Sequence, residues 1–137
     1  MQILIVGIST EITAAIKGAF KGIAASTGKT CEVIQVEDEK QALQEIFKKD
    51  FAFVFAIAPK EQIFRFIPIE KRRECVCIAL DKEGRSLDVF TAFIKNADGV
   101  VNVKDLNKLE EYMTEIAKRH EELYRGFFKV KAEVEVV

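Results

Sequence analysis

Five short apolar segments, separated by stretches with helical spacing, constrain the fold of this chain more than any other feature of its sequence. The segments cover residues 2–8, 30–36, 51–58, 74–80 and 99–103, and most are rich in β-branched residues or phenylalanine. Runs of this kind are typical of strands that are buried on both faces. Strands that alternate with helices predict a parallel sheet covered by helices on both sides.

The intervening stretches predict five helices. The first covers residues 10–25, where the hydroxyl of Ser9 or Thr10 can cap its start. The second covers about 39–49, and the third is short because Pro68 restricts the preceding backbone. A fourth helix starts near residue 86, and a fifth runs from Asp105 or Leu106 to about residue 124. Helical spacing predicts that these residues face the sheet: Ile12, Ala15, Ile16, Ala19, Phe20, Ile23, Ala42, Leu43, Ile46, Phe47, Leu87, Phe90, Phe93, Ile94, Leu109, Met113, Ile116, Ala117 and Leu123.

Five β/α units joined by right-handed crossovers predict one compact domain over residues 1–125. We expect a three-layer, doubly wound α/β fold with a parallel sheet of flavodoxin-like strand order 2-1-3-4-5. Folds of this type bind ligands at the carboxyl edge of the sheet, near the point where the strand order reverses. Candidate site residues are therefore sought at the ends of the strands.

Residues 126–137 form a C-terminal extension of a different character. Its last nine residues, "KVKAEVEVV", alternate charged with apolar side chains, which predicts an extra, half-buried strand. Such a strand could pair with an edge of its own sheet, pair with a second protomer, or begin a further domain.

Aromatic side chains outside a core are typical of interfaces. The candidate interface residues are Tyr112, Tyr124, Phe127 and Phe128.

The charge balance excludes several classes of partner. The 21 basic and 22 acidic residues are spread along the chain and give a formal net charge of -1. No field of one sign would attract nucleic acid or an anionic membrane. The apolar start "ILIVGI" is too short to cross a bilayer and lacks the features of a secretory signal. We therefore predict a cytoplasmic protein that binds neither nucleic acid nor membranes.

The cysteines and the histidine give little support to catalysis or metal binding. Cys31, Cys75 and Cys77 form no CxxC pair, and the i, i+2 spacing of the last two points both toward one face of a strand. We expect reduced, buried thiols. His120, the one histidine of the sequence, is expected at the surface or near a helix end. No catalytic Ser/His/Asp or Cys/His arrangement stands out, so we predict no enzyme activity, no metal and no cofactor.

Two stretches have features of phosphate sites. "GIAASTGKT", residues 22–30, ends as a P-loop does, but five residues instead of four separate Gly22 from Gly28, and the stretch leads from a helix into a strand. "VGIST", residues 6–10, does follow a strand and open a helix, although capping alone explains it. Taken with polar residues after later strands, the candidate ligand or anion contacts are Ser9, Thr10, Asp81 and Lys104.

The five β/α units together with "ILIV", "DFAFVFAIAP", "CVCIAL" and "NADGVV" resemble the receiver domain of bacterial response regulators over residues 2–124. The resemblance implies a phosphoacceptor aspartate at the end of the third strand and an acidic pair after the first strand that holds magnesium. It further implies a Ser or Thr after the fourth strand and a Lys after the fifth. The resemblance also implies that the chain forms dimers or binds partners through the face made by its fourth helix, fifth strand and fifth helix.

The chain departs from this pattern at each acidic position. The acidic pair falls on Gly7 and Ile8, and the phosphoacceptor position on Phe55, whose phenyl ring cannot accept phosphate. The hydroxyl position falls on Leu80 or Ala79. Lys104 comes one residue later than the family's lysine, so the strand alternation can turn it to the other face, where Asp81 or Asp105 could pair with it.

These departures predict an atypical or pseudo-receiver that lacks the phosphorylation site. The leading hypothesis is a phosphorylation-independent signalling or scaffolding domain that acts through protein–protein contacts. Its expected partner is a second copy of itself or another signalling protein. The alternative is a regulatory module that binds a small ligand or nucleotide at the carboxyl edge of the sheet.

Overall fold

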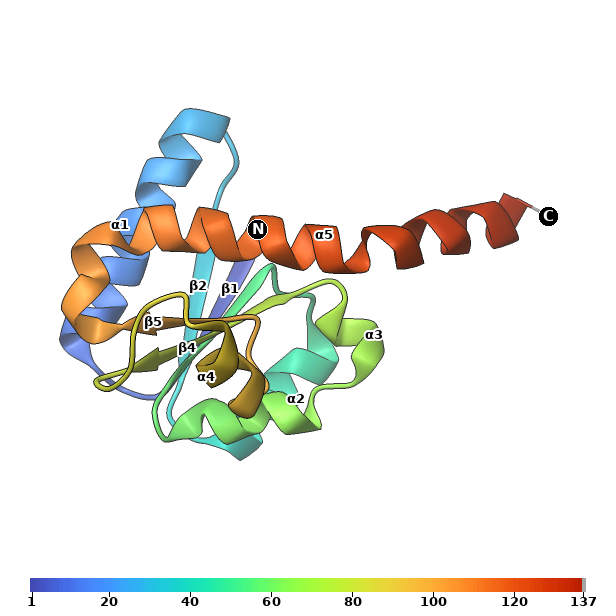
Figure 1. Cartoon of the computed structure of the whole chain (residues 1–137). Coiled ribbons are helices and arrows are strands. Elements are labelled where there is room, and N and C mark those ends of the chain that lie inside the picture. Colours follow the sequence, from blue (N-terminus) through green and yellow to red (C-terminus); the bar gives the residue numbers. More distant parts are fainter. Residues whose placement is uncertain (137) are drawn as a thin grey trace.

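The computed structural model describes the backbone of residues 1–136 and the side chains of residues 1–125 and 133. A five-stranded parallel sheet in the order β2-β1-β3-β4-β5 lies at its centre, which confirms the predicted fold class and strand order (Figure 1). The strands are β1 (Gln2–Val6), β2 (Glu32–Val36), β3 (Phe53–Ile57), β4 (Val76–Asp81) and β5 (Gly99–Asn102).

Helices cover both faces of the sheet. They are α1 (Thr10–Thr27), α2 (Glu39–Lys48), the 3-10 helix η1 (Lys60–Phe66), α3 (Ile69–Arg72), α4 (Val89–Ile94), the 3-10 helix η2 (Val103–Lys108) and α5 (Leu109–Val136). The predicted cap of the first helix is confirmed, because the hydroxyl of Ser9 accepts a hydrogen bond from the amide of Ile12 at 3.3 Å. None of the helices in the described residues combines the length and apolar composition that a membrane span requires.

The strand alternation divides the core into two parts. One part packs the sheet against α1 and α5 and contains Ile16, Phe20, Phe55 and Ile116. The other part packs the opposite face of the sheet against α2, η1 and α4. The ring of Phe20 meets that of Phe55 edge-on, with centroids 6.1 Å apart. The central strands are therefore buried on both faces, as the nearly continuous apolar runs predicted.

Helix α4 differs from its prediction in both length and orientation. Its apolar residues Val89, Phe90, Phe93 and Ile94 are between 56% and 80% exposed. The prediction that the last three face the sheet is wrong. The preceding Leu87 has a φ of 66° and donates its amide to the carbonyl of Val100 in β5 at 2.8 Å. Because this segment occupies the edge of β5, the short helix begins late, and Ala92 is its one buried residue.

Helix α5 continues to Val136, so the prediction of a C-terminal strand is wrong for the residues described. A lone strand needs a neighbour for its backbone groups, whereas a helix satisfies them within itself. Lys, Ala and Glu are good helix formers, and the single Gly126 costs only about 1 kcal/mol. The 28 residues span about 42 Å, and the last turns project beyond the sheet (Figure 1).

Two further predictions of buried side chains are wrong, although the helices that carry them are placed correctly. Phe47 of α2 is 61% exposed and Leu123 of α5 is 70% exposed. Their helix neighbours Ala42, Ile46, Met113 and Ile116 are buried as predicted. Phe47 follows Ile46 directly and so turns away from the sheet, while Leu123 lies where α5 leaves the sheet.

Candidate functional site

The carboxyl ends of β1 and β3 are apolar. Gly7 follows β1 with a φ of 113°, and a Cβ at this position would lie 3.0 Å from the Cβ of Ile57. A glycine is therefore needed here both for its positive φ and because a side chain would crowd Ile57. Ile8 is exposed beside it, and β3 ends at Ile57. Phe55 is fully buried two residues earlier in the strand, where it contacts Phe20 rather than facing the edge. Its assignment to the phosphoacceptor position stays a prediction.

A surface hollow lies at the start of α1. It has a volume of about 330 Å³ and is lined by Ile8, Ser9, Thr10, Thr13, Ala14, Lys17 and Gln35. The side-chain amide of Gln35 donates to the carbonyl of Gly7 at 2.9 Å and to the hydroxyl of Thr13 at 3.0 Å. Asp81 and Lys104 do not line this hollow. The four predicted ligand contacts are thus not brought together at one place.

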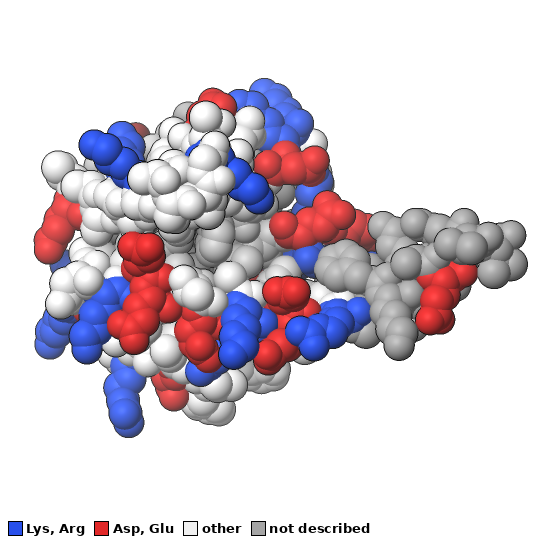
Figure 2. Space-filling view, turned by 90° about the horizontal axis from the view of Figure 1, so that it is seen from above, with Lys and Arg blue, Asp and Glu red and all other residues white. Residues whose placement is uncertain are grey.

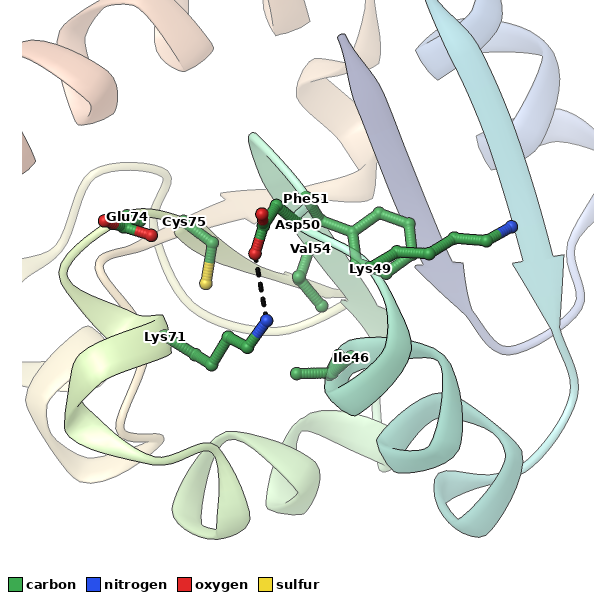
Figure 3. A pocket seen from close by; sticks show the side chains of 8 residues that line it. All are labelled: Ile46, Lys49, Asp50, Phe51, Val54, Lys71, Glu74 and Cys75. Carbon is green, nitrogen blue, oxygen red and sulfur yellow. Dashed lines mark hydrogen bonds and ion pairs between the residues drawn. The ribbon is translucent and has the colours of Figure 1, made fainter.

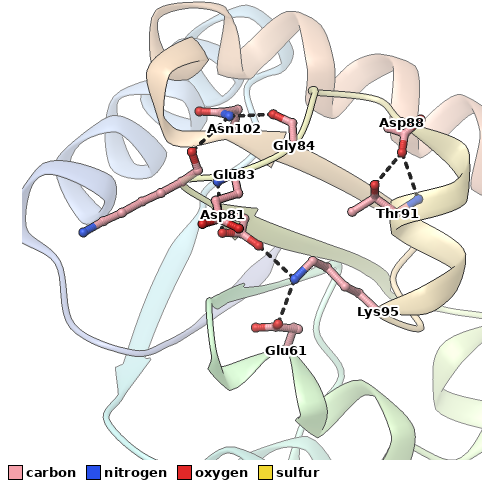
Figure 4. Close-up of polar contacts among 9 residues, drawn as sticks. Glu61, Asp81, Glu83, Gly84, Asp88, Thr91, Lys95 and Asn102 are labelled. Atoms are coloured by element: carbon pink, nitrogen blue, oxygen red, sulfur yellow. Dashed lines mark hydrogen bonds and ion pairs between the residues drawn. The ribbon is translucent and has the colours of Figure 1, made fainter.

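The end of β4 carries an ion triad instead of an open acidic pocket (Figure 4). The ammonium group of Lys95, at the end of α4, lies 2.8 Å from Asp81 and 2.9 Å from Glu61 of η1. All three side chains are mostly buried. Burial alone would lower the pKa of Lys95 and raise the pKa of Asp81. The ion pairs and hydrogen bonds outweigh burial, so the net pKa of Lys95 is raised and that of Asp81 is lowered.

The end of β5 is closed by a hydrogen-bond network. The hydroxyl of Ser86 donates to Asp105 at 2.6 Å and accepts from the amide of Asn102 at 2.8 Å. The side-chain amide of Asn102 donates to the carbonyl of Gly84 at 2.6 Å (Figure 4). Asp105 lies inside η2, so α5 starts at Leu109, later than the predicted start at Asp105 or Leu106. Because Asp81 and Asp105 have other partners, neither pairs with the exposed Lys104.

The candidate interface aromatics have different surroundings. Tyr112 is partly buried against the α1 side of the core. Tyr124 is also partly buried, and its ring lies 4.7 Å from that of His120. Burial raises the pKa of the Tyr124 hydroxyl. The side chains of Phe127 and Phe128 lie outside the described residues, so their place at an interface stays a prediction.

A polar cluster at the amino ends of β4 and β5 was not foreseen. The guanidinium of Arg72 lies 3.6 Å from Asp98, whose carboxylate also accepts the amide of Cys77 at 2.7 Å. His120 is buried and its Nε2 lies 2.9 Å from the carbonyl of Arg72, so its predicted surface position is wrong. An apolar residue in its place along α5 would have signalled the burial, but a histidine did not.

The described side chains form no cluster of metal ligands, and on the face that Figure 2 shows they form no large basic patch. Among the residues whose side chains are described, no three His, Cys, Asp or Glu groups lie close enough together to hold a metal ion. Figure 2 shows acidic and basic side chains interspersed over one face of the body rather than collected by sign. This distribution agrees with the net charge of -1.

The sheet order and the two helical layers define a flavodoxin-like domain, which is the fold of receiver domains. Several solved structures share it. One is the chemotaxis response regulator CheY4 of Vibrio cholerae, with a TM-score of 0.61 and 15% sequence identity, where the match covers 84% of this chain and 97% of that chain. Another is the signal receiver domain of an HD domain-containing protein from Pseudomonas fluorescens Pf-5, with a TM-score of 0.64 and 13% identity over 90% of this chain and 91% of that chain. A third is RcsB from Salmonella enterica serovar Typhimurium bound to promoter rprA, with a TM-score of 0.63 and 13% identity over 91% of this chain and 65% of that chain.

Comparisons with protein-family models and with the sequences of curated proteins find no match. At identities of 13–15%, the structural likeness establishes the fold alone. It confirms the architecture that the resemblance to receiver domains implied.

Replacing Lys95 by methionine tests the ion triad. We expect the free energy of unfolding at pH 7 to fall by about 2 kcal/mol, because Asp81 and Glu61 would then be mostly buried without a countercharge. The lowered pKa of Asp81 stabilises the parent protein above the ordinary aspartate pKa of about 4, and this stabilisation is lost as the pH falls through the folded-state value. The difference between parent and variant should therefore shrink from pH 7 to pH 3 in urea titrations.

Lys60→Met is the matched control for this measurement. Lys60 also lies on η1 and pairs with Glu39, but at 3.9 Å and in a more exposed setting. Its removal should change stability by less than about 0.5 kcal/mol, with little pH dependence. Equal effects of the two variants would show that the triad contributes no more than an ordinary surface pair.

Proposed function

We propose that this chain is a signalling or scaffolding domain that acts through protein–protein contacts, as a homodimer and without phosphorylation. The observation that carries the proposal is the apolar outer surface of α4. Val89, Phe90, Phe93 and Ile94 are all exposed, although the helix has only six residues. Large neighbouring apolar side chains on a surface are typical of interaction sites.

The spacing of apolar residues along α5 favours a second copy of the chain as the partner. Residues at alternating spacings of three and four make up one stripe of this helix: Leu109, Met113, Ile116, His120 and Leu123. The first four are buried against the domain, whereas Leu123 is exposed. In the sequence the same spacing continues at Phe127, Val130 and Val134, whose side chains lie outside the described residues. A continuous stripe of this spacing is the pattern by which two helices pair in a coiled coil.

The composition of the carboxyl edge supports independence from phosphorylation. Gly7 and Ile8 follow β1, and Ile57 ends β3, so none of these positions offers a carboxylate for magnesium or phosphate. Asp81, the acidic residue that ends β4, is held by Lys95 at 2.8 Å. Phosphoryl transfer needs a nucleophile and a cation that neutralises the developing charge. These residues supply neither function.

The alternative, a small-ligand or nucleotide site at this edge, has weaker support. Of its four residues, Ser9 and Thr10 line the hollow at α1, while Asp81 lies in the ion triad and Lys104 on η2. The amides at the start of α1 are also partly used, because Ser9 caps the helix. The exposed apolar surface is the stronger indication.

Sedimentation equilibrium tests the dimer. The parent protein should have twice the chain mass of 15.5 kDa at micromolar concentration. Leu123→Glu should weaken the dimer at least about tenfold, because a carboxylate at the seam would have to be desolvated. Phe93→Glu should weaken it as well, because the proposal places the apolar α4 surface in the same contact. Both side chains are exposed in the single chain, so the variants should keep the helical content of the parent.

Phe47→Glu is the control, because Phe47 is similarly exposed but lies on α2, in the layer opposite α5. It should sediment as the parent does. A second arm adds beryllofluoride and magnesium, which mimic the phosphorylated state, and should leave both mass and NMR spectrum unchanged. A monomeric parent would overturn the dimer, and a shift of resonances near Ile57 and Asp81 would overturn phosphorylation independence.

A further inference from the structure

Cys75 and Cys77 form a pair of neighbouring thiols that the proposed contacts do not use. Their sulfur atoms lie 3.8 Å apart at the start of β4, and both side chains are free and buried. Cys77 is inside the strand, whereas Cys75 lies in the bend just before it. A small movement of the bend would therefore bring the sulfurs to bonding distance, about 2.05 Å, without disturbing the ladder of β4.

The two thiols have unlike electrostatic surroundings. A hydrogen bond from Cys77 lowers the pKa of Cys75, and the guanidinium of Arg72 lowers it further, so that together they outweigh burial. Burial raises the pKa of Cys77 well above its ordinary value. Since the thiolate is the reactive form of cysteine, Cys75 is the better nucleophile and Cys77 remains a protonated neighbour.

A small cavity lies beside Cys75. Its volume is about 10 Å³, close to the least that one water molecule occupies. Ile46 and Val54 line this cavity. Figure 3 shows the sulfur of Cys75 pointing toward the side chain of Lys71. Lys71 pairs with Asp50 at 2.9 Å, and Asp50 is largely exposed, which places this ion pair between the cavity and solvent. This space is at the lower limit for a single water molecule, so bulky reagents are excluded, and a slightly larger molecule enters only when the bend at Cys75 moves.

We propose that Cys75 and Cys77 are a dithiol modification site that hydrogen peroxide converts to an intrachain disulfide. The thiolate of Cys75 attacks one peroxide oxygen, the O–O bond breaks, and hydroxide leaves to become water, which forms a sulfenic acid on Cys75. The sulfur of Cys77 then attacks that of Cys75, the S–O bond breaks, and the leaving oxygen takes the proton of Cys77 to form a second water. The two thiols lose two electrons and the peroxide gains them.

The experiment treats the full chain with hydrogen peroxide and follows each cysteine by mass spectrometry. Tryptic peptide 74–82 contains both thiols and should lose two hydrogens, which dithiothreitol should restore. This reaction should run about tenfold faster than the oxidation of Cys31 in the same chain. In Cys77→Ala the reaction should stop at a sulfenic acid on Cys75 that dimedone captures, and in Cys75→Ala Cys77 should stay reduced.

Cys31→Ala is the matched control and should behave as the parent does. Thermal unfolding monitored by circular dichroism checks that the variants fold. If one of them does not fold, the loss of two hydrogens from peptide 74–82 of the parent protein still tests whether the disulfide forms. Three outcomes would overturn the proposal: oxidation of Cys31 ahead of the pair, a disulfide between two chains, or conversion of Cys75 to sulfinic acid with Cys77 still reduced.

Discussion

Replacing Asp98 by alanine should lower the free energy of unfolding by about 3 kcal/mol. The side chain of Asp98 is 8% exposed and serves two groups at once. One carboxylate oxygen lies 3.6 Å from the guanidinium of Arg72, and the other accepts the amide of Cys77 at 2.7 Å. Alanine would leave a buried cation without its countercharge and a backbone N–H without an acceptor. Urea titration at pH 7 measures the loss.

Asp98→Asn separates the two contributions. Burial raises the pKa of Asp98 although the amide of Cys77 and the charge of Arg72 favour the carboxylate. The stability that a raised pKa provides is complete below the ordinary aspartate value and is lost as the pH rises through the folded-state value. The neutral side chain is therefore well tolerated here, and asparagine, which keeps an acceptor for Cys77, should lose less than half of what alanine loses.

Equal losses in the two Asp98 variants would mean that the ion pair with Arg72 dominates and the hydrogen bond contributes little. Losses below about 1 kcal/mol in both would contradict the burial of this cluster. The carbonyl groups of Phe64 and Asn96 still hold Arg72 in either variant, at 3.1 and 2.7 Å, so its side chain should stay in place. The comparison then reports on Asp98 alone.

The architecture could be predicted from the sequence because it depends on local patterns. Apart from Asp81 at the end of β4, each strand in the structure lies inside an apolar run that is visible in the sequence, and α1 begins where Ser9 can cap it. The order of five β/α units then leaves few arrangements of a parallel sheet. Periodicity and capping are properties of neighbouring residues, so one sequence is enough to recognise them.

The orientation of α4 could not be predicted in the same way. Its Phe90, Phe93 and Ile94 have helical spacing, which indicates a stripe but not the direction in which the stripe faces. The direction depends on Leu87, whose amide bonds to β5 and which takes a left-handed conformation. That bond joins two segments distant in the sequence, and an apolar helix surface turned to solvent is indistinguishable, by pattern, from one turned to a core.

The ion triad and the polar cluster could not be predicted either, because their residues lie far apart in the sequence. Lys95, Asp81 and Glu61 come from three different elements, and His120 meets Arg72 across the end of the sheet. Charged residues of this kind usually lie in solvent, so the sequence offered no reason to pair them. The last residues of α5 could not be assigned because their pattern fits two structures. The alternation of charged and apolar residues in "KVKAEVEVV" fits a strand, whereas the spacing of four between Val130 and Val134 fits a helix.

Gly99→Ala should destabilise the protein by about 3 kcal/mol, the upper part of the usual range for overpacking. Gly99 begins β5 and pairs with Ile78 of β4. A Cβ on Gly99 would overlap Cδ1 and Cγ1 of Ile116 and lie 2.8 Å from its Cγ2. Ile116 is fully buried between α5 and the sheet, so three of its atoms would have to move within a closely packed core. Chemical denaturation at fixed protein concentration measures the loss.

Gly18→Ala is the matched control for this glycine. Gly18 lies on the exposed side of α1, where a Cβ would meet nothing within 4 Å, and alanine there should stabilise the protein by about 0.5–1 kcal/mol. Ile116→Ala provides the second test, because it empties the space that the new methyl group needs. Alone it should cost about 3 kcal/mol. Combined with Gly99→Ala it should cost at least about 1 kcal/mol less than the sum of the single changes, since neighbouring substitutions couple. Strict additivity would contradict the contact between β5 and α5.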